Sequence, residues 1–201
     1  MIGQKDEGIV LALRFCWIFI LSALMSAQSP NNATPAAKAS VITIHVFKSG
    51  LFSGLAHNHV VVAPISQANV DPAALTAEIT VAAKEMKVTD TDVSEKDRAE
   101  IQSTMLGPKV LDQEKYPEIR FKSSHIEQSS PQHYRVMGML DLHGTKHEIT
   151  LEVTGGPEHY HGTTKLKQSE FGIKPISLGG GSIKVKDELE LEFDVYAAAG
   201  K

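Results

Sequence analysis

The chain has 201 residues, of which 42% are hydrophobic and 22% are charged, enough for one globular domain with its own core. Its formal net charge is −4, and its lysines and arginines are scattered, so nucleic acid is not expected as a partner. The one cysteine, Cys16, lies in an N-terminal apolar segment. A mature chain without that segment would have no disulfide, thiolate nucleophile or cysteine-bound zinc.

Residues 1–27 have the features of a secretory signal peptide, since Lys5 and Arg14 precede a nearly continuous apolar run from Phe15 to Ala27. The run is short for a membrane-spanning helix, so a signal peptide is favoured and an uncleaved anchor is the alternative. Residues 28–40 are rich in Ser, Pro, Asn and Ala, which predicts a flexible linker. The domain is therefore expected over residues 41–197 of a periplasmic or secreted protein.

The first half of this domain predicts three strands and a helix. Alternating or continuous apolar residues indicate strands over 41–48, 55–64 and 75–87. Ser94 and an acid three residues later form a capping-box pattern, which predicts a short helix over 95–106 that ends before a Gly-Pro pair.

The second half predicts an antiparallel meander with one apolar face. Side chains of a strand point to opposite faces in turn, and Gly144 can take the positive φ of a tight hairpin turn. A further strand is expected over 161–168 and a last one over 188–195. The residues expected on the inner face of the meander and of the last strand are Ile119, Phe121, Ser123, Val136, Gly138, Leu140, Leu142, Ile149, Leu151, Val153, Leu189, Leu191, Phe193 and Val195.

About eight strands, one short helix and no βαβ rhythm predict an all-β fold, an antiparallel eight-stranded β-barrel. A barrel of this size can hold one slender ligand, or its inner side chains can fill it completely. An interior of Ile, Leu, Val, Met and Phe suits an apolar chain and offers no nucleophile or general base. No strained nucleophile turn is present either, so the chain is not expected to be an enzyme.

Several motifs resemble the YceI-like family of periplasmic lipid- and polyisoprenoid-binding proteins. They are the segment 110–123, Gly138-x-Leu-x-Leu-His-Gly144, Ile149-Thr-Leu-x-Val153 and Glu170-Phe-Gly-Ile173, and the resemblance covers about residues 40–197. It implies a lipocalin-like barrel that encloses the tail of an isoprenoid quinone or similar lipid, as a carrier or sequestering protein without a cofactor. The chain departs from the family pattern over 46–59, 104–109 and 146–148, which leaves the identity of the lipid open.

Alternation and apolarity suggest which residues contact such a lipid. Lys48, His57 and His59 are candidates for the mouth, where polar groups would fix a head group. The candidates for the apolar contact are Phe52, Leu55, Val61, Ile119, Phe121, Leu140, Leu142, Phe171, Ile173, Ile176 and Phe193. Transient membrane contact is compatible with this function. The oligomeric state is open, and strand edges left by an imperfectly closed barrel would allow a homodimer.

Two alternatives to lipid binding are open, and the first rests on the nine histidines. His57-x-His59 and His159-x-His161 each place two imidazoles on one face of a strand, where they could share zinc, copper or nickel. No carboxylate or cysteine at diagnostic spacing completes a site, so no metal is expected, with His57 and His59 favoured if one binds. The other alternative is an interaction or stress-response adaptor without ligand.

Overall fold

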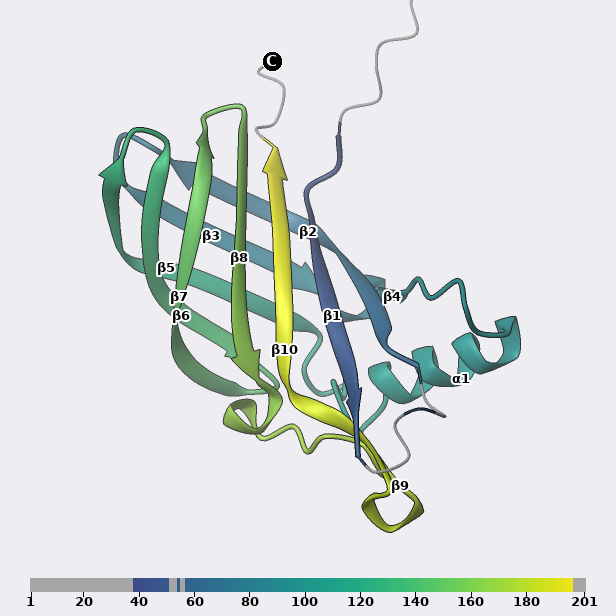
Figure 1. The fold of residues 1–201 in the computed structure, drawn as a ribbon. Helices are drawn as coiled ribbons and strands as arrows, with labels where there is room; N and C mark the ends of the chain where they lie inside the picture. Colours follow the sequence, from purple (N-terminus) through teal and green to yellow (C-terminus); the bar gives the residue numbers. More distant parts are fainter. Residues whose placement is uncertain (1–37, 51–53, 55–56, 197–201) are drawn as a thin grey trace, which may run out of the picture. The chain divides into compact units, whose positions relative to one another are not determined.

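The computed structural model describes residues 38–50, 54 and 57–196. The predicted signal peptide, most of the predicted linker, and Phe52 and Leu55 lie outside these residues. Figure 1 shows a strongly curved sheet with one helix beside it. Its elements are β1 (Val41–Ser49), β2 (His59–Asp71), β3 (Thr76–Ala82), β4 (Lys87–Val88), α1 (Glu95–Leu106), β5 (Glu118–Ser130), β6 (His133–Leu142), β7 (Thr145–Gly156), β8 (His159–Lys167), β9 (Ser177–Leu178) and β10 (Ile183–Tyr196), with 3-10 turns at Ala83–Glu85, Gln168–Phe171 and Gly179–Gly181.

Eight long antiparallel strands close into a barrel in the order β1-β10-β8-β7-β6-β5-β3-β2. A pairing of β1 with β2 completes the ring, and the two-residue strands β4 and β9 attach to β2 and β10. The predicted eight-stranded antiparallel barrel with a short helix is therefore confirmed. A homodimer stays a prediction, since in the described part of the chain β3 pairs with β5 over Glu118–Lys122 alone, whereas β5 runs to Ser130.

The inner face of the barrel follows the alternation expected from the sequence. On β6, Val136, Gly138, Leu140 and Leu142 are buried and alternate with more exposed residues. On β7, Val153 is buried between two exposed residues. The hairpin between β6 and β7 turns at His143 and Gly144, with φ of 52° and 73°, as a two-residue turn with two positive φ values requires.

The second strand is longer than predicted, because a proline does not end it. β2 runs through Pro64 to Asp71, and the strand that pairs with it on one side changes near Pro64. It pairs with β4 at 61–62 and with β3 from Ile65 onwards, so Pro64 lies between these pairings. A proline lacks an N–H but is tolerated at such an interruption of the ladder.

The helix forms where the capping pattern predicts it. The Asp97 carboxylate bonds the hydroxyl of Ser94, however, where a capping box would use the Ser94 backbone N–H. The Ser94 Oγ accepts a hydrogen bond from the Asp97 N–H at 3.1 Å, and the Asp97 carboxylate accepts one from the Ser94 hydroxyl at 2.7 Å. Gln102 ties the helix to β4, since its side chain bonds the Val88 N–H and the Met86 carbonyl. Among the described residues, no helix has the length and apolar character needed to cross a membrane.

One end of the barrel is filled by the segment that follows β8. Phe171 has no exposed surface, and Ile173 and Leu111 are buried beside the core. The His147 and Phe171 rings meet edge to face with centroids 5.3 Å apart. We call Leu111, Leu142, Phe171 and Ile173 the plug, because they occupy the end of the barrel where the β6–β7 turn lies.

Candidate functional site

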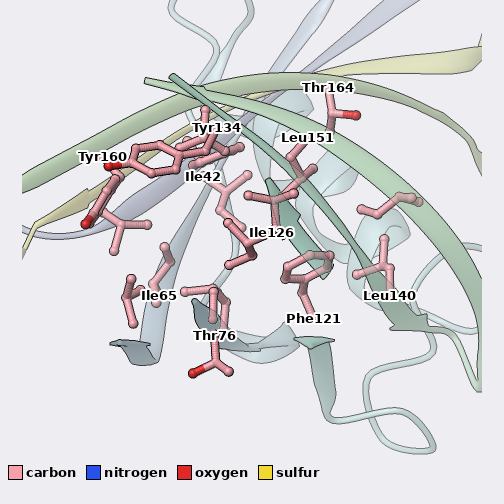
Figure 2. A pocket seen from close by; sticks show the side chains of 18 of the residues that line it. Ile42, Ile65, Thr76, Phe121, Ile126, Tyr134, Leu140, Leu151, Tyr160 and Thr164 are labelled. Carbon is pink, nitrogen blue, oxygen red and sulfur yellow. The ribbon is translucent and has the colours of Figure 1, made fainter. Parts of the chain in front are cut away.

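The opposite end of the barrel contains an apolar cavity of about 150 Å³. Figure 2 shows inward side chains from several strands gathered around it. All eight long strands contribute to its wall. Its residues are Ile42, Ile65, Val70, Asp71, Pro72, Leu75, Thr76, Ala77, Ile79, Phe121, Ile126, Tyr134, Val136, Leu140, Ile149, Leu151, Val153, Tyr160, Thr164, Leu191, Phe193 and Val195.

The mouth of the cavity lies at the β2–β3 turn. Asp71, Pro72 and Leu75 belong to the cavity wall and are exposed to solvent, with Leu75 45% exposed. The Asp71 carboxylate accepts hydrogen bonds from the N–H groups of Ala73 and Ala74 at 2.9 and 3.0 Å, so it fixes the turn. A ligand can therefore reach the interior past this turn.

Two phenylalanine rings of the wall pack closely against glycines of the neighbouring strands. A Cβ added at Gly138 would meet the Phe121 ring and the Lys122 carbonyl oxygen at 2.5 Å, and one at Gly162 would meet the Phe193 ring. The missing side chains give the rings room against the wall. The glycines therefore help to keep the cavity open.

Hydroxyl groups supply most of the polar atoms of the wall. Tyr134 and Tyr160 meet edge to face with centroids 6.1 Å apart. Burial raises the pKa of the Tyr160 phenol, with a smaller contribution from Tyr134, so the phenol stays neutral at physiological pH. Thr76 and Thr164 are the other hydroxyl residues. A neutral phenol can donate or accept a hydrogen bond with the polar part of a ligand.

The predicted apolar contacts divide between the cavity and the rest of the core. Phe121, Leu140 and Phe193 line the cavity. The other described candidates are absent from its wall: Val61, Leu142, Phe171 and Ile173 are buried elsewhere in the core, Ile119 packs against it, and Ile176 is half-buried. Alternation identifies the inward face of a strand but not the height of a residue along the barrel, so it could not tell which inward residues line the cavity.

The candidates for apolar contact left out several wall residues that face inward on strands the sequence had identified. Ile42, Leu151 and Leu191 are examples, and the alternation that found their strands also indicated their direction. Tyr134 lies two residues before Val136 on the same face, so alternation could also have found it, whereas Tyr160 precedes the strand predicted over 161–168.

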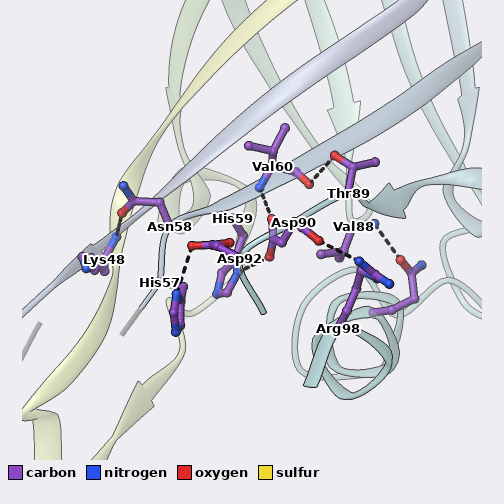
Figure 3. A network of polar contacts seen from close by, with 11 residues as sticks. Lys48, His57, Asn58, His59, Val60, Val88, Thr89, Asp90, Asp92 and Arg98 are labelled. Atoms are coloured by element: carbon purple, nitrogen blue, oxygen red, sulfur yellow. Dashed lines mark hydrogen bonds and ion pairs between the residues drawn. The ribbon is translucent and has the colours of Figure 1, made fainter. Parts of the chain in front are cut away.

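Lys48, His57 and His59, which the sequence suggested for the mouth of a lipid site, are absent from the wall of this cavity. Lys48 lies near the end of β1, His59 is the first residue of β2, and His57 lies just before it (Figure 3). The Lys48 N–H donates to the Asn58 side-chain oxygen at 3.1 Å. Strand direction explains their absence, since β1 ends and β2 begins at the end away from the β2–β3 turn.

Each histidine of the first pair lies against its own aspartate (Figure 3). His57 Nδ1 is 3.0 Å from Asp92 Oδ2, and His59 Nδ1 is 2.6 Å from Asp90 Oδ2. Asp90 is buried and also accepts a hydrogen bond from the Val60 N–H at 2.7 Å. The hydrogen bond to His57 is the main reason why the pKa of Asp92 is lowered. These contacts hold the segment before α1 against β2.

A different group of ligating side chains gathers on β8 and β10. Among the described residues, His161, Glu192 and Asp194 are the one set of three whose ligand atoms all lie within 4.8 Å of one another. The two acids come from the last strand, whose outer face the sequence had indicated. Only the pairing of β8 with β10 brings them to the histidines.

Comparison with known proteins gives one family and a set of similar structures. A family model described as the YceI-like domain matches residues 37–197. BcnA from Burkholderia cenocepacia is 21% identical, with a TM-score of 0.57 over 81% of this chain and 98% of that one. A YCEI protein from Campylobacter jejuni is 17% identical, with a TM-score of 0.53 over 70% of this chain and 82% of that one. At these identities the similar structures establish the barrel fold alone. No curated protein sequence matches the chain.

Proposed function

The chain belongs to the YceI-like family, and we propose that its barrel binds the hydrocarbon part of a long apolar lipid, a polyisoprenoid or an isoprenoid quinone. The protein would act as a non-catalytic carrier or sequestering protein in the periplasm. The apolar cavity of about 150 Å³ is the observation that carries this proposal. Each methylene that leaves water for such a site contributes about 0.8 kcal/mol.

The size of the cavity limits how such a lipid enters. An engineered protein cavity of about 150 Å³ holds one benzene molecule, so about six carbons fit here without rearrangement. A longer tail requires side chains of the wall to move apart. Phe121 and Phe193 are suited to this because their rings lie across the cavity wall and are not clamped by a side chain at Gly138 or Gly162.

The chemistry of the wall supports binding over catalysis. Among the described residues that line the cavity there is no serine, cysteine, histidine or lysine. Asp71, the one carboxylate of the wall, is engaged with the backbone of the β2–β3 turn. The two tyrosine hydroxyls near the mouth are the groups best placed to hydrogen-bond a quinone carbonyl or a prenyl hydroxyl.

Native mass spectrometry tests this function on the full chain, exported to a periplasm and purified without detergent, followed by extraction with organic solvent. A prenyl lipid at one molecule per protein is the expected result. A protein that is empty, and that takes up no prenyl alcohol or quinone when these are added, would contradict the proposal.

A pair of variants locates the lipid. Leu151→Trp adds volume inside the cavity and should abolish or strongly weaken uptake, because Leu151 lines the wall. Leu178→Trp is the control, because Leu178 is 60% exposed on β9. Equal uptake by the two variants would place the lipid outside this cavity.

A further inference from the structure

The pairing of β8 with β10 places four potential metal ligands on the outer wall of the barrel. His161 is opposite Asp194, and the neighbouring outward positions carry His159 on β8 and Glu192 on β10. The residues between them point inward, since Tyr160 and Phe193 line the cavity. Two imidazoles and two carboxylates therefore share one outer surface, where the two strands lie side by side (Figure 1).

The distances within this group suit a metal ion. His161 Nδ1 lies 3.3 Å from Asp194 Oδ1 and 4.0 Å from Glu192 Oε1. Ligands bound tetrahedrally to zinc at about 2.0–2.2 Å are about 3.3–3.6 Å from one another. The His161–Asp194 separation already has this value, and a small rotation of the exposed Glu192 side chain would adjust its separations from His161 and Asp194, which are within 4.8 Å. The ion would take the place of the proton that His161 shares with Asp194.

Asp194 is held in its position by a second histidine. His159 Nε2 lies 2.6 Å from Asp194 Oδ1, and the His159 ring stacks on Tyr196 with centroids 4.3 Å apart and an angle of 6° between the rings. Burial acts to raise the pKa of Asp194, but the hydrogen bonds to His159 and His161 outweigh it and lower that pKa. Hydrogen-bonded partners of this kind orient the ligands of metal sites.

We propose that His161, Asp194 and Glu192 bind a divalent transition-metal ion, with Zn²⁺ as its representative, and that His159 positions the Asp194 carboxylate. Imidazole and carboxylate donors are typical zinc ligands, and three protein ligands leave a position for water. The first histidine pair is a weaker candidate, because His57 and His59 each contact a separate aspartate and form no group of three. This site is independent of the lipid cavity.

Isothermal titration with Zn²⁺ tests the site on the full chain after treatment with a chelator and removal of lipid. The wild-type protein should bind one Zn²⁺ at neutral pH. His161→Gln and Asp194→Asn should each weaken binding about tenfold or more, and Glu192→Gln should weaken it less. His125→Gln is the matched control, because His125 is an exposed histidine on another strand.

Thermal unfolding gives a second readout, because an ion that binds only the folded protein raises its Tm. Zn²⁺ should raise the Tm of the wild type and of His125→Gln, and should leave that of His161→Gln nearly unchanged. The side chain of His161 is 39% exposed, so this variant is expected to fold. The proposal is overturned if the wild type binds no Zn²⁺, or if binding survives His161→Gln and is lost in the double variant His57→Gln/His59→Gln.

Discussion

At the scale of single residues, a glycine beside the cavity is as important to it as the side chains that line it. Gly138→Ala would bring a methyl group against the Phe121 ring and the Lys122 carbonyl oxygen. The carbonyl belongs to the sheet and cannot retreat, so the ring must move into the cavity. We expect a loss of about 1–3 kcal/mol in the free energy of unfolding and weaker lipid uptake.

Urea denaturation and a lipid uptake assay check this prediction. Gly156→Ala is the control, because a Cβ at Gly156 meets nothing within 4 Å. If Gly138→Ala had the stability and lipid uptake of the wild type, the Phe121 ring could move without filling the cavity, and Gly138 would not keep the cavity open.

The plug should be important for stability. Phe171 has no exposed surface, so Phe171→Ala should cost about 3–5 kcal/mol in the free energy of unfolding. Leu178→Ala, at an exposed position, should change it by less than about 0.5 kcal/mol. Chemical denaturation of both variants measures the difference, and a similar small cost for each would mean that the plug is not packed as described.

The 3-10 turn Gln168–Phe171, which carries Phe171 of the plug, also makes a pH-dependent contact. The Ser169 hydroxyl and N–H donate to the Asp187 carboxylate at 2.6 and 2.8 Å, and the hydroxyl bond is the main reason why the pKa of Asp187 is lowered. A lowered folded-state pKa gives stability that is present above the unfolded-state pKa of about 3.9 and is lost as pH falls through the folded-state value.

Asp187→Asn should therefore destabilise the protein at neutral pH and should differ less from the wild type as the solution becomes more acidic. Unfolding free energies of both proteins across this range provide the measurement. A difference that stays constant with pH would mean that the charge of Asp187 plays no part. Ser169→Ala should show the same trend, because it removes the main donor.

At the scale of elements, the segment before α1 depends on one buried carboxylate. Asp90 is buried and contacts both His59 and the Val60 N–H. His59→Ala leaves the buried Asp90 Oδ2 without its hydrogen-bond partner, which should lower the free energy of unfolding by about 1–3 kcal/mol. His57→Ala should have little effect, because His57 and Asp92 are exposed. Denaturant unfolding of the two variants checks the order, and equal costs would contradict it.

The strands and the helix also show which parts of the fold and of the site the sequence could predict. Period-two alternation identified the inward faces of β5, β6, β7 and β10, and the Ser94 pattern identified α1. It predicted the antiparallel meander of β5, β6 and β7 but did not identify which strands are neighbours elsewhere. Pairing decides that Asp194 meets His161 and that β2 continues past Pro64, and pairing depends on contacts between distant parts of the chain. Of the residues that the sequence suggested as lipid contacts, Phe121, Leu140 and Phe193 line the cavity and Phe171 does not, because alternation gives the direction of a side chain but not its height along the barrel.

At the scale of the whole barrel, the cavity has its mouth at the β2–β3 turn, and the plug fills the end away from that turn. A lipid that enters through this mouth would do so with its tail leading and its polar group last. Its head group would then remain at the rim, beside Tyr134 and Tyr160, where another protein can reach it. Loading and release would use the same opening, so each exchange must finish before the next begins, and a donor and an acceptor would compete for one rim.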